Sequence, residues 1–215
     1  MVQEMMHAAR RFLNWLTPGT RWLLAAWVIG FGLSFSPAAP ALALSGPAVR
    51  HGQIWRAVSY GFLPYSFMDF LLGGVAFALL GTTLERRWTA RTLLAYALFV
   101  IAATGLSWAM FPGVDSRLWR GGGPLFFGML AAWGRLCGDE TVFLAPSLSM
   151  KSAKAALIFG GISLLAATLS TGWRNAAFAG SGAVWGLVHL GVRTKLGESA
   201  DHPAPSGQRI SRLEL

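Results

Sequence analysis

The segment at residues 92–114 carries no charged side chain. It is longer than the roughly 20 apolar residues that an α-helix needs to cross the hydrocarbon of a bilayer. In lipid every backbone polar group must be bonded internally, so a segment of this kind forms a helix. Hydrophobic residues make up 54% of the chain and charged residues 13%, about half the charge of a typical soluble domain. These features predict a membrane protein.

Five further apolar segments are bounded by charges or prolines in the same way. The six predicted membrane helices are residues 22–35, 67–84, 92–114, 121–133, 155–170 and 175–192. We expect a loop at residues 36–66 and a longer connection at residues 137–154. The sequence therefore predicts an all-α polytopic membrane protein. It has an amphipathic segment at residues 1–20, one six-helix membrane domain at residues 21–197 and a disordered cytoplasmic tail at residues 198–215. A single cysteine, Cys137, excludes an internal disulfide.

The fourth segment, GGGPLFFGMLAAW, is the shortest. Together with Gly134 it reaches about 20 Å, short of the roughly 30 Å of hydrocarbon. As a membrane helix it must begin partway down, where only a buried cavity satisfies loose backbone groups. The glycines before Pro124 leave backbone N–H groups open at the positive end of a helix. Two interpretations stay open for this start: a binding site, or close packing between small residues.

The first residues have apolar side chains at helical spacing, with Arg10 and Arg11 on the other face. This pattern predicts an amphipathic helix that lies on the membrane surface. The two arginines, the following apolar run and the residues at 41–43, Ala-Leu-Ala, also fit a signal peptide with its cleavage site. We keep that alternative beside the first.

Six spans place both termini on one side, and the basic residues then divide unevenly. The side of the termini has thirteen Lys and Arg and the other side five, which together make all 18. The five are Arg50, Arg56, Arg117, Arg120 and Arg174. The positive-inside rule therefore places both termini in the cytoplasm. The net charge of +9 indicates contact with anionic lipid headgroups rather than with nucleic acid in a chain this apolar.

Several short motifs now carry a resemblance. QIWR at residues 53–56, FL at 62–63 and GTTLER at 81–86 resemble the first loop and second helix of the rhomboid family, which comprises six-helix intramembrane serine proteases and inactive relatives. Residues 121–130 resemble the start of that family's fourth helix, which opens with G-x-S-G. GAVWGL at 182–187 resembles its sixth helix, and residues 142–157 resemble the cytoplasmic connection of some bacterial members. The resemblance spans about residues 20–195 and implies a bacterial-type inner-membrane location.

The positions that the resemblance implies for chemistry are all changed. The nucleophilic serine of the family falls on Gly123 and its sixth-helix histidine on Ala179. Two histidines and an asparagine of its second helix fall on Pro64, Asp69 and Gly73. Glycine supplies no nucleophile and alanine no base, so these positions lack the groups that acyl transfer requires. Another pair, Ser181 and His189, lies about 12 Å apart along one helix and cannot hydrogen-bond.

Asp69 is the remaining candidate, because a carboxylate inside a span is costly and marks a functional position by default. It lies four residues before Gly73, so both face the same way. Its expected role is a polar contact to a partner or to water, and the alternative is a structural bond to the amides at 121–123, to Arg56 or to Arg120. No cofactor motif and no metal spacing is found.

We therefore expect a catalytically inactive rhomboid-like protein that binds or helps to assemble the transmembrane helices of other membrane proteins. The alternatives are a rhomboid-like protease with a relocated active site, and a small-solute or lipid conduit.

Overall fold

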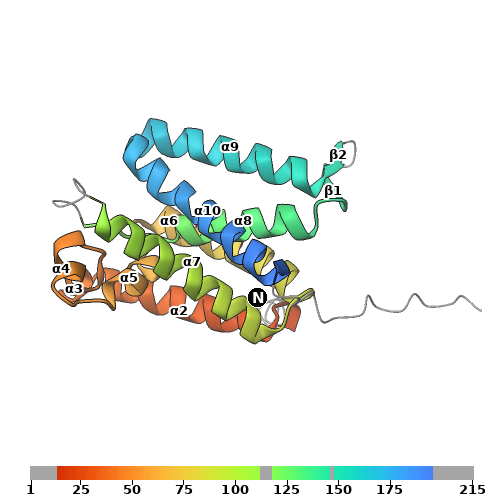
Figure 1. Cartoon of the computed structure of the whole chain (residues 1–215). Coiled ribbons are helices and arrows are strands. Elements are labelled where there is room, and N and C mark those ends of the chain that lie inside the picture. Colours follow the sequence, from red (N-terminus) through yellow and green to blue (C-terminus); the bar gives the residue numbers. More distant parts are fainter. Residues whose placement is uncertain (1–13, 112–117, 146–147, 196–215) are drawn as a thin grey trace, which may run out of the picture.

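The computed structural model of the chain describes residues 14–111, 118–145 and 148–195. Six long helices run back and forth in these ranges and pack side by side (Figure 1). They are α2 (Pro18–Ser34), α6 (Phe67–Glu85), α7 (Ala90–Met110), α8 (Gly123–Leu136), α9 (Ser152–Thr171) and α10 (Trp173–Lys195). Each overlaps one predicted segment. Residues 1–13 of the predicted amphipathic segment (1–20), and the tail at 198–215, lie outside the described residues.

Three of these helices, α6, α7 and α9, are long and apolar enough to cross a membrane. α2 has 17 residues and α8 has 14, so both are shorter than the roughly 20 residues of a full span. The structure therefore supports a mostly helical membrane protein.

Two expectations were wrong in detail. The region at 36–66, expected to be a loop, holds short helices: α3 (Ala39–Leu42), α4 (Gly46–Arg50), α5 (Arg56–Ser59) and the 3-10 helix η1 (Tyr60–Phe62). The fold is also not all-α, because strands β1 (Thr141–Ala145) and β2 (Leu148–Lys151) form an antiparallel hairpin before α9. A connection outside the lipid is free to pair as strands, and Val142 and Phe143 favour that state.

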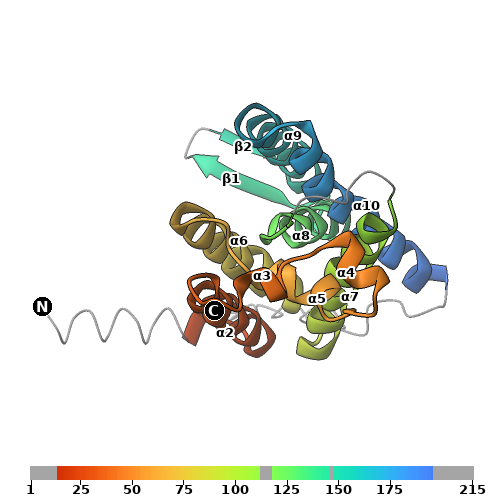
Figure 2. The ribbon, with the colours of Figure 1, turned by 90° about the vertical axis from the view of Figure 1, so that its left-hand side faces the viewer.

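α8 lies at the centre of the bundle, with the other long helices around it (Figure 2). Half of its residues are buried. Its closest neighbour is α10, and small residues make the approach possible. A Cβ added at Gly182 would overlap the carbonyl of Pro124, and one at Gly186 would lie 3.1 Å from Gly128 Cα. Small residues therefore allow close packing of α8 against α10.

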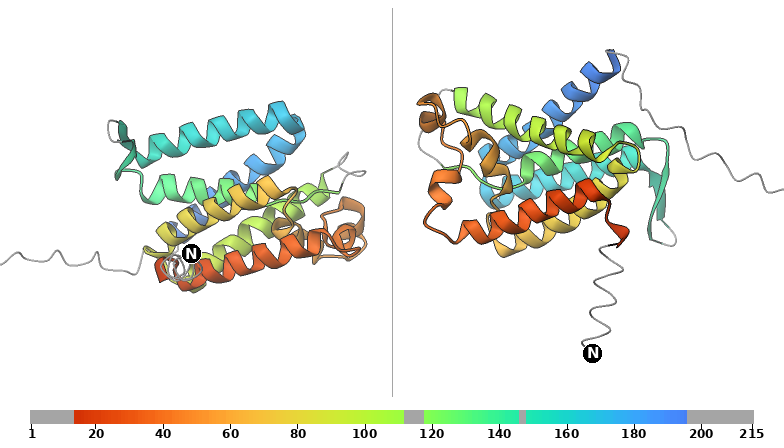
Figure 3. Two further views of the ribbon diagram at one scale, coloured as in Figure 1. Left: turned by 180° about the vertical axis from the view of Figure 1, so that it is seen from behind. Right: turned by 90° about the horizontal axis from the view of Figure 1, so that it is seen from below.

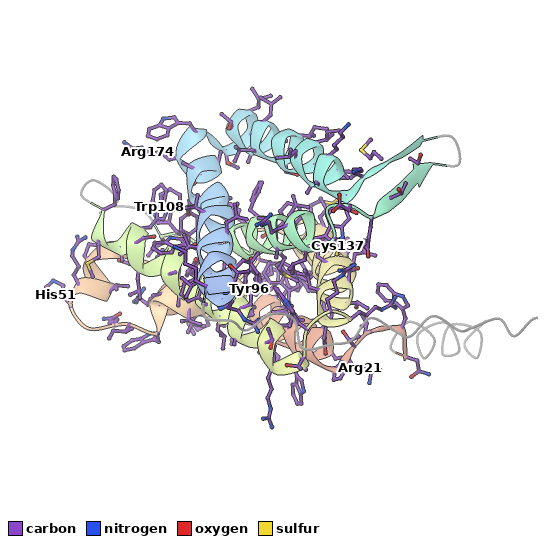
Figure 4. The ribbon with its side chains drawn as sticks, turned by 45° about the vertical axis from the view of Figure 1, so that its right-hand side comes forward. Arg21, His51, Tyr96, Trp108, Cys137 and Arg174 are labelled. Carbon is purple, nitrogen blue, oxygen red and sulfur yellow. The ribbon has the colours of Figure 1, made fainter. Side chains whose placement is uncertain are left out.

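The two ends of the bundle differ in charge. At one end, the buried Glu85 accepts hydrogen bonds from the backbone N–H groups of Gly19 (2.7 Å) and Thr20 (2.8 Å), so the end of α6 caps the start of α2. We call this the basic end, because the basic residues that border the long helices gather there. Figure 4 shows Arg21 and Cys137 at this end, and His51 and Arg174 at the other. The basic residues described at this end are Arg21, Arg86, Arg87, Arg91, Arg135, Lys151, Lys154, Arg193 and Lys195.

Candidate functional site

A cavity of about 710 Å³ opens at the end of the bundle opposite the basic end. Five segments contribute to it: the start of α6, the loop before α8, the start of α8, the last turns of α9 and the start of α10. Its polar side chains are Tyr65, Ser66, Asp69, Arg120, Thr171 and Asn175. Both residues that replace the nucleophile and the base of the resembled family, Gly123 and Ala179, line it as well.

Asp69 is placed by the first turn of α6. Ser66 caps the helix, its hydroxyl accepting a hydrogen bond from the Asp69 N–H (3.1 Å). The Asp69 carboxylate accepts in turn, through Oδ2, from the N–H of Tyr65 (2.7 Å). These two bonds hold the carboxylate at the wall of the cavity. One alternative for Asp69 was a hydrogen bond from the glycine amides at 121–123. The Gly121 N–H does not make it, because it donates to Tyr60 O (3.1 Å).

Two arginines were expected as alternative partners of Asp69, and neither bonds to it. The Arg56 guanidinium donates to Gln53 Oε1 (2.6 Å) and to the carbonyls of Pro40 and Ala43 in the region of α3. The Arg120 guanidinium lies 5.0 Å from the ring centroid of Tyr65, a cation–π distance. Arg120 and Asp69 thus line one cavity as separate charges.

Gly123 and Ala179 face each other across α8 and α10. A Cβ added at Gly123 would lie 2.9 Å from the Ala179 Cβ. Gly121 precedes this contact with φ +112°, a conformation that glycine adopts without strain. This conformation of Gly121 lets the loop bring the start of α8 close to Asp69. A Cβ at Gly121 would lie 3.5 Å from Asp69 Oδ2.

A smaller cavity of about 200 Å³ adjoins the first, since Asp69 and Gly123 line both. Gly73 and Ser163 line the smaller one. Asp69 and Gly73 therefore face the same space, as their four-residue spacing predicts. Pro64 is different: it is buried before α6 and lines neither cavity, and its carbonyl accepts a hydrogen bond from the Ser34 hydroxyl (3.3 Å).

Two hydroxyl groups of the larger cavity form structural bonds. The Ser66 hydroxyl caps α6, and the Thr171 hydroxyl donates to Ala167 O (2.8 Å). Neither His nor Lys is among the described residues that line the two cavities, so these hydroxyls have no nitrogen base beside them. A general base must lie within hydrogen-bond reach of the proton that it takes.

Two other titratable groups, Tyr60 and Cys137, lie outside the cavities. Burial raises the pKa of the Tyr60 phenol, whose hydroxyl donates to Ile101 O (3.0 Å). Burial also raises the pKa of the Cys137 thiol, which follows α8 at the basic end. Both groups therefore hold their protons at neutral pH. What the cavity offers is a fixed carboxylate, a stacked guanidinium and apolar walls, which suit binding.

A family model described as "Eukaryotic integral membrane protein (DUF1751)" matches residues 21–191. The chain belongs to this family of integral membrane proteins. The match covers every residue that lines the two cavities. The description of the family names eukaryotic proteins and gives no support to the bacterial inner membrane that was expected. No match was found among curated proteins.

Within this DUF1751 chain, sequence reasoning missed several cavity residues. Asn175 opens a predicted helix and carried no motif, and Ser163 lay inside an apolar segment. Only the packing of α9 and α10 around α8 brings them to the cavities. Ser181 lines neither cavity, and its hydroxyl accepts a hydrogen bond from Trp108 Nε1 (3.1 Å) and donates to Phe178 O.

Proposed function

We propose that this chain is a rhomboid-like membrane protein without protease chemistry, and that it binds transmembrane segments of other membrane proteins. The observation that carries the proposal is the open cavity of about 710 Å³ at the positions of the lost nucleophile and base. Glycine and alanine stand there, while a carboxylate, Asp69, is kept on the wall. A cavity that keeps a costly charge but lacks a nucleophile is suited to recognition.

The contact between Gly123 and Ala179 supports the rhomboid likeness. The resemblance was built on separate motifs, 56 positions apart in the sequence. A serine and a histidine that act together must be neighbours in space. The two corresponding positions here are in direct contact across α8 and α10, which is the arrangement that the resemblance requires.

The surroundings of α9 support binding of a membrane segment. α9 lies at the edge of the bundle (Figure 3), and within it only Ser152 and Ala155 are buried. Its exposed apolar side chains include Leu157 (77%) and Leu169 (80%). A groove of about 550 Å³ with mostly apolar walls also runs between α9 and its neighbours α8 and α10. A partner helix beside α9 would reach the cavity at Ala167 and Thr171 and meet Asp69 as a polar anchor.

Site-specific photo-crosslinking in living cells tests this proposal. A photoreactive amino acid at Thr171, which lines the cavity, is expected to capture discrete membrane proteins. The matched control is the same group at Leu169, which is exposed on α9 and does not line the cavity. Adding Asp69→Leu should reduce the adducts from position 171 at least tenfold. Equal adducts from both positions, or adducts indifferent to Asp69→Leu, would contradict the proposal.

A protease with a relocated site is the second candidate, and one observation favours it. The side chain of Ser163 lines the smaller cavity together with Asp69 and Gly123. A serine-directed fluorophosphonate separates the two functions. The binding proposal expects no labelling of the purified protein in liposomes. Labelling that Ser163→Ala abolishes would replace it with a hydrolase.

The proposal includes a topology. All six long helices lie in the membrane, the two shorter ones packed beside longer neighbours, and both termini are cytoplasmic. The basic end then faces the anionic leaflet of the cytoplasmic side. No nucleic acid, cofactor or metal enters the proposed function.

A further inference from the structure

A second groove lies on the other side of the bundle, between α2 and α6 and away from α9 (Figures 1 and 3). Its volume is about 490 Å³. Its walls are almost wholly apolar, with Leu24 and Val28 from α2 and Leu71 and Val75 from α6. Val28 and Val75 are exposed by 55% and 59%, so the groove opens to the surroundings of the bundle. It shares no lining residue with the proposed partner cavity, and the inference below does not rest on the proposed function.

A single charged side chain, Arg21, is among the described residues that line this groove. Its Nε–H donates to Leu16 O (3.1 Å), which fixes the orientation of the guanidinium. The Arg21 side chain is exposed at the basic end of the bundle (Figure 4), and its two terminal nitrogens can donate to a ligand there. A guanidinium held in this way presents paired N–H groups to a phosphate.

The groove extends from Arg21 toward the middle of the bundle. Val28 lies seven residues further along α2, a rise of about 10 Å. That length falls within one leaflet, whose hydrocarbon is roughly 15 Å deep. Gly74 leaves room in the wall, because a Cβ there would lie at an ordinary contact distance of 3.7 Å from Trp27 Cδ1. The Trp27 Nε1–H already donates to Phe70 O (3.0 Å), so the indole presents an apolar surface.

From this geometry we propose that the α2–α6 groove binds an anionic phospholipid of the leaflet at the basic end. One acyl chain lies in the groove between Leu24 and Leu71, and the phosphate is bound by Arg21. Apolar walls match the chain, and the oriented guanidinium matches the headgroup. The basic residues gathered at this end draw anionic lipids to it.

Two other occupants fit less well. A membrane helix beside the groove would, by the positive-inside rule, carry Lys and Arg at this end, and these would repel Arg21. A second copy of the chain in a symmetric dimer would bring the two Arg21 guanidiniums together at the same depth in the membrane, where like charges repel. A lipid avoids both conflicts.

Native mass spectrometry of the full chain, released from nanodiscs of phosphatidylglycerol and phosphatidylcholine in equal amounts, tests the proposal. The wild type is expected to retain phosphatidylglycerol in preference to phosphatidylcholine. Arg21→Gln should lower phosphatidylglycerol binding about fivefold, since one cation near the surface is worth about 1 kcal/mol, and leave phosphatidylcholine unchanged. Gly74→Leu fills the groove and should lower binding of both lipids.

Two matched controls separate the groove from the rest of the basic end. Arg91→Gln removes an exposed cation at the basic end outside the groove, and Gly32→Leu adds the same side chain to α2 where nothing lies within 4 Å. Both should bind lipid as the wild type does. Equal losses in Arg21→Gln and Arg91→Gln would overturn the proposal. So would a dimer that Gly74→Leu dissociates, because the groove would then be an interface between two copies. Arg21→Gln alone keeps the test valid if Gly74→Leu fails to fold.

Discussion

Glu85 shows how one buried charge joins two helices. The side chain is 7% exposed, and its carboxylate accepts from two backbone N–H groups and the Thr20 hydroxyl at the start of α2. These N–H groups have no partner within α2 itself, and the positive end of the helix favours the negative charge. Glu85 therefore anchors the start of α2 at the end of its own helix, α6.

Glu85→Gln keeps the shape of this side chain and removes its charge. A hydrogen bond to a charged group is worth about 1.5–3 kcal/mol, so the variant should lose about 2 kcal/mol. For a chain of this length the loss corresponds to a fall of roughly 4–8 °C in the unfolding temperature. Thermal unfolding in mild detergent measures it. Glu140→Gln, whose side chain is 54% exposed beside Arg87, is the control and should change little.

Putting a serine and a histidine back at positions 123 and 179 tests whether the cavity can still support proteolysis. In the double variant Gly123→Ser, Ala179→His the Cβ atoms of the two new side chains would lie 2.9 Å apart, and we still expect no proteolysis. Pro124 supplies no N–H for an oxyanion, and Asp69 lines the same cavity, where it repels a developing negative charge. Losing one oxyanion donor alone costs about 10²–10³ in rate. Cleavage of a generic rhomboid substrate in liposomes is the assay, and robust turnover would refute the binding proposal.

The candidate site was only partly predictable from single residues. Asp69 was recognised because a carboxylate interrupts an apolar segment, and Gly123 and Ala179 because motifs flank them. Asn175 and Ser163 carry no such signal, because their place in the site depends on which helices meet there. Pro64 was assigned from the resemblance, and its burial away from both cavities depends on the short elements before it, which the sequence did not predict.

α8 and α10 pack closely because glycines of α10 leave room for the backbone of α8. Gly186→Leu should destabilise the protein strongly, because even a Cβ there would overlap the Tyr96 hydroxyl, which donates to Gly128 O (2.6 Å). Overpacking costs typically 1–3 kcal/mol, and the loss of this bond adds to it. Gly191→Leu is the control on the same helix, since nothing lies within 4 Å of its position. Equal unfolding temperatures for the two variants would show that the α8–α10 contact is not tight.

The long helices were predictable because lipid leaves a chain few alternatives. An uncharged segment in hydrocarbon has to bond its own backbone, so its limits follow from charges and prolines. Outside the hydrocarbon this constraint is lost. The short helices α3 to α5 and the β1–β2 hairpin depend on tertiary contacts, such as the Leu44–Trp119 bridge and the bonds from Ser152 N–H to Glu140 O and from Ala153 N–H to Gly138 O. Such tertiary contacts produce no periodic pattern of apolar residues from which the sequence could predict them.

The whole bundle is polarised, and the polarity is consistent with the expected topology. In the described residues, four basic side chains border the helices at the end opposite the basic end: Arg50, Arg56, Arg120 and Arg174. Arg50 and Arg56 there donate to backbone carbonyls, at Ala109 and at Pro40 and Ala43. Their charges thus serve the local structure. At the basic end, Arg87 bonds to Leu136 O and pairs with Glu140, while the exposed Arg21 donates to Leu16 O.

Reporter fusions expressed in bacteria test the orientation directly. Fusions after Trp88 and after Leu215 should both report the cytoplasm, and one after Asp115, which lies outside the described residues, the opposite side. The physical reason is that each long helix reverses direction, so the ends of α6 and α10 return to the same side as the start of α2, where Lys and Arg are concentrated. Replacing Arg86, Arg87 and Arg91 together by Gln should weaken this preference, and replacing Arg50 and Arg56 should not. A fusion after Leu215 that reports the opposite side from the fusion after Trp88 would mean an odd number of spans between the two points, and the six-helix topology would have to be abandoned.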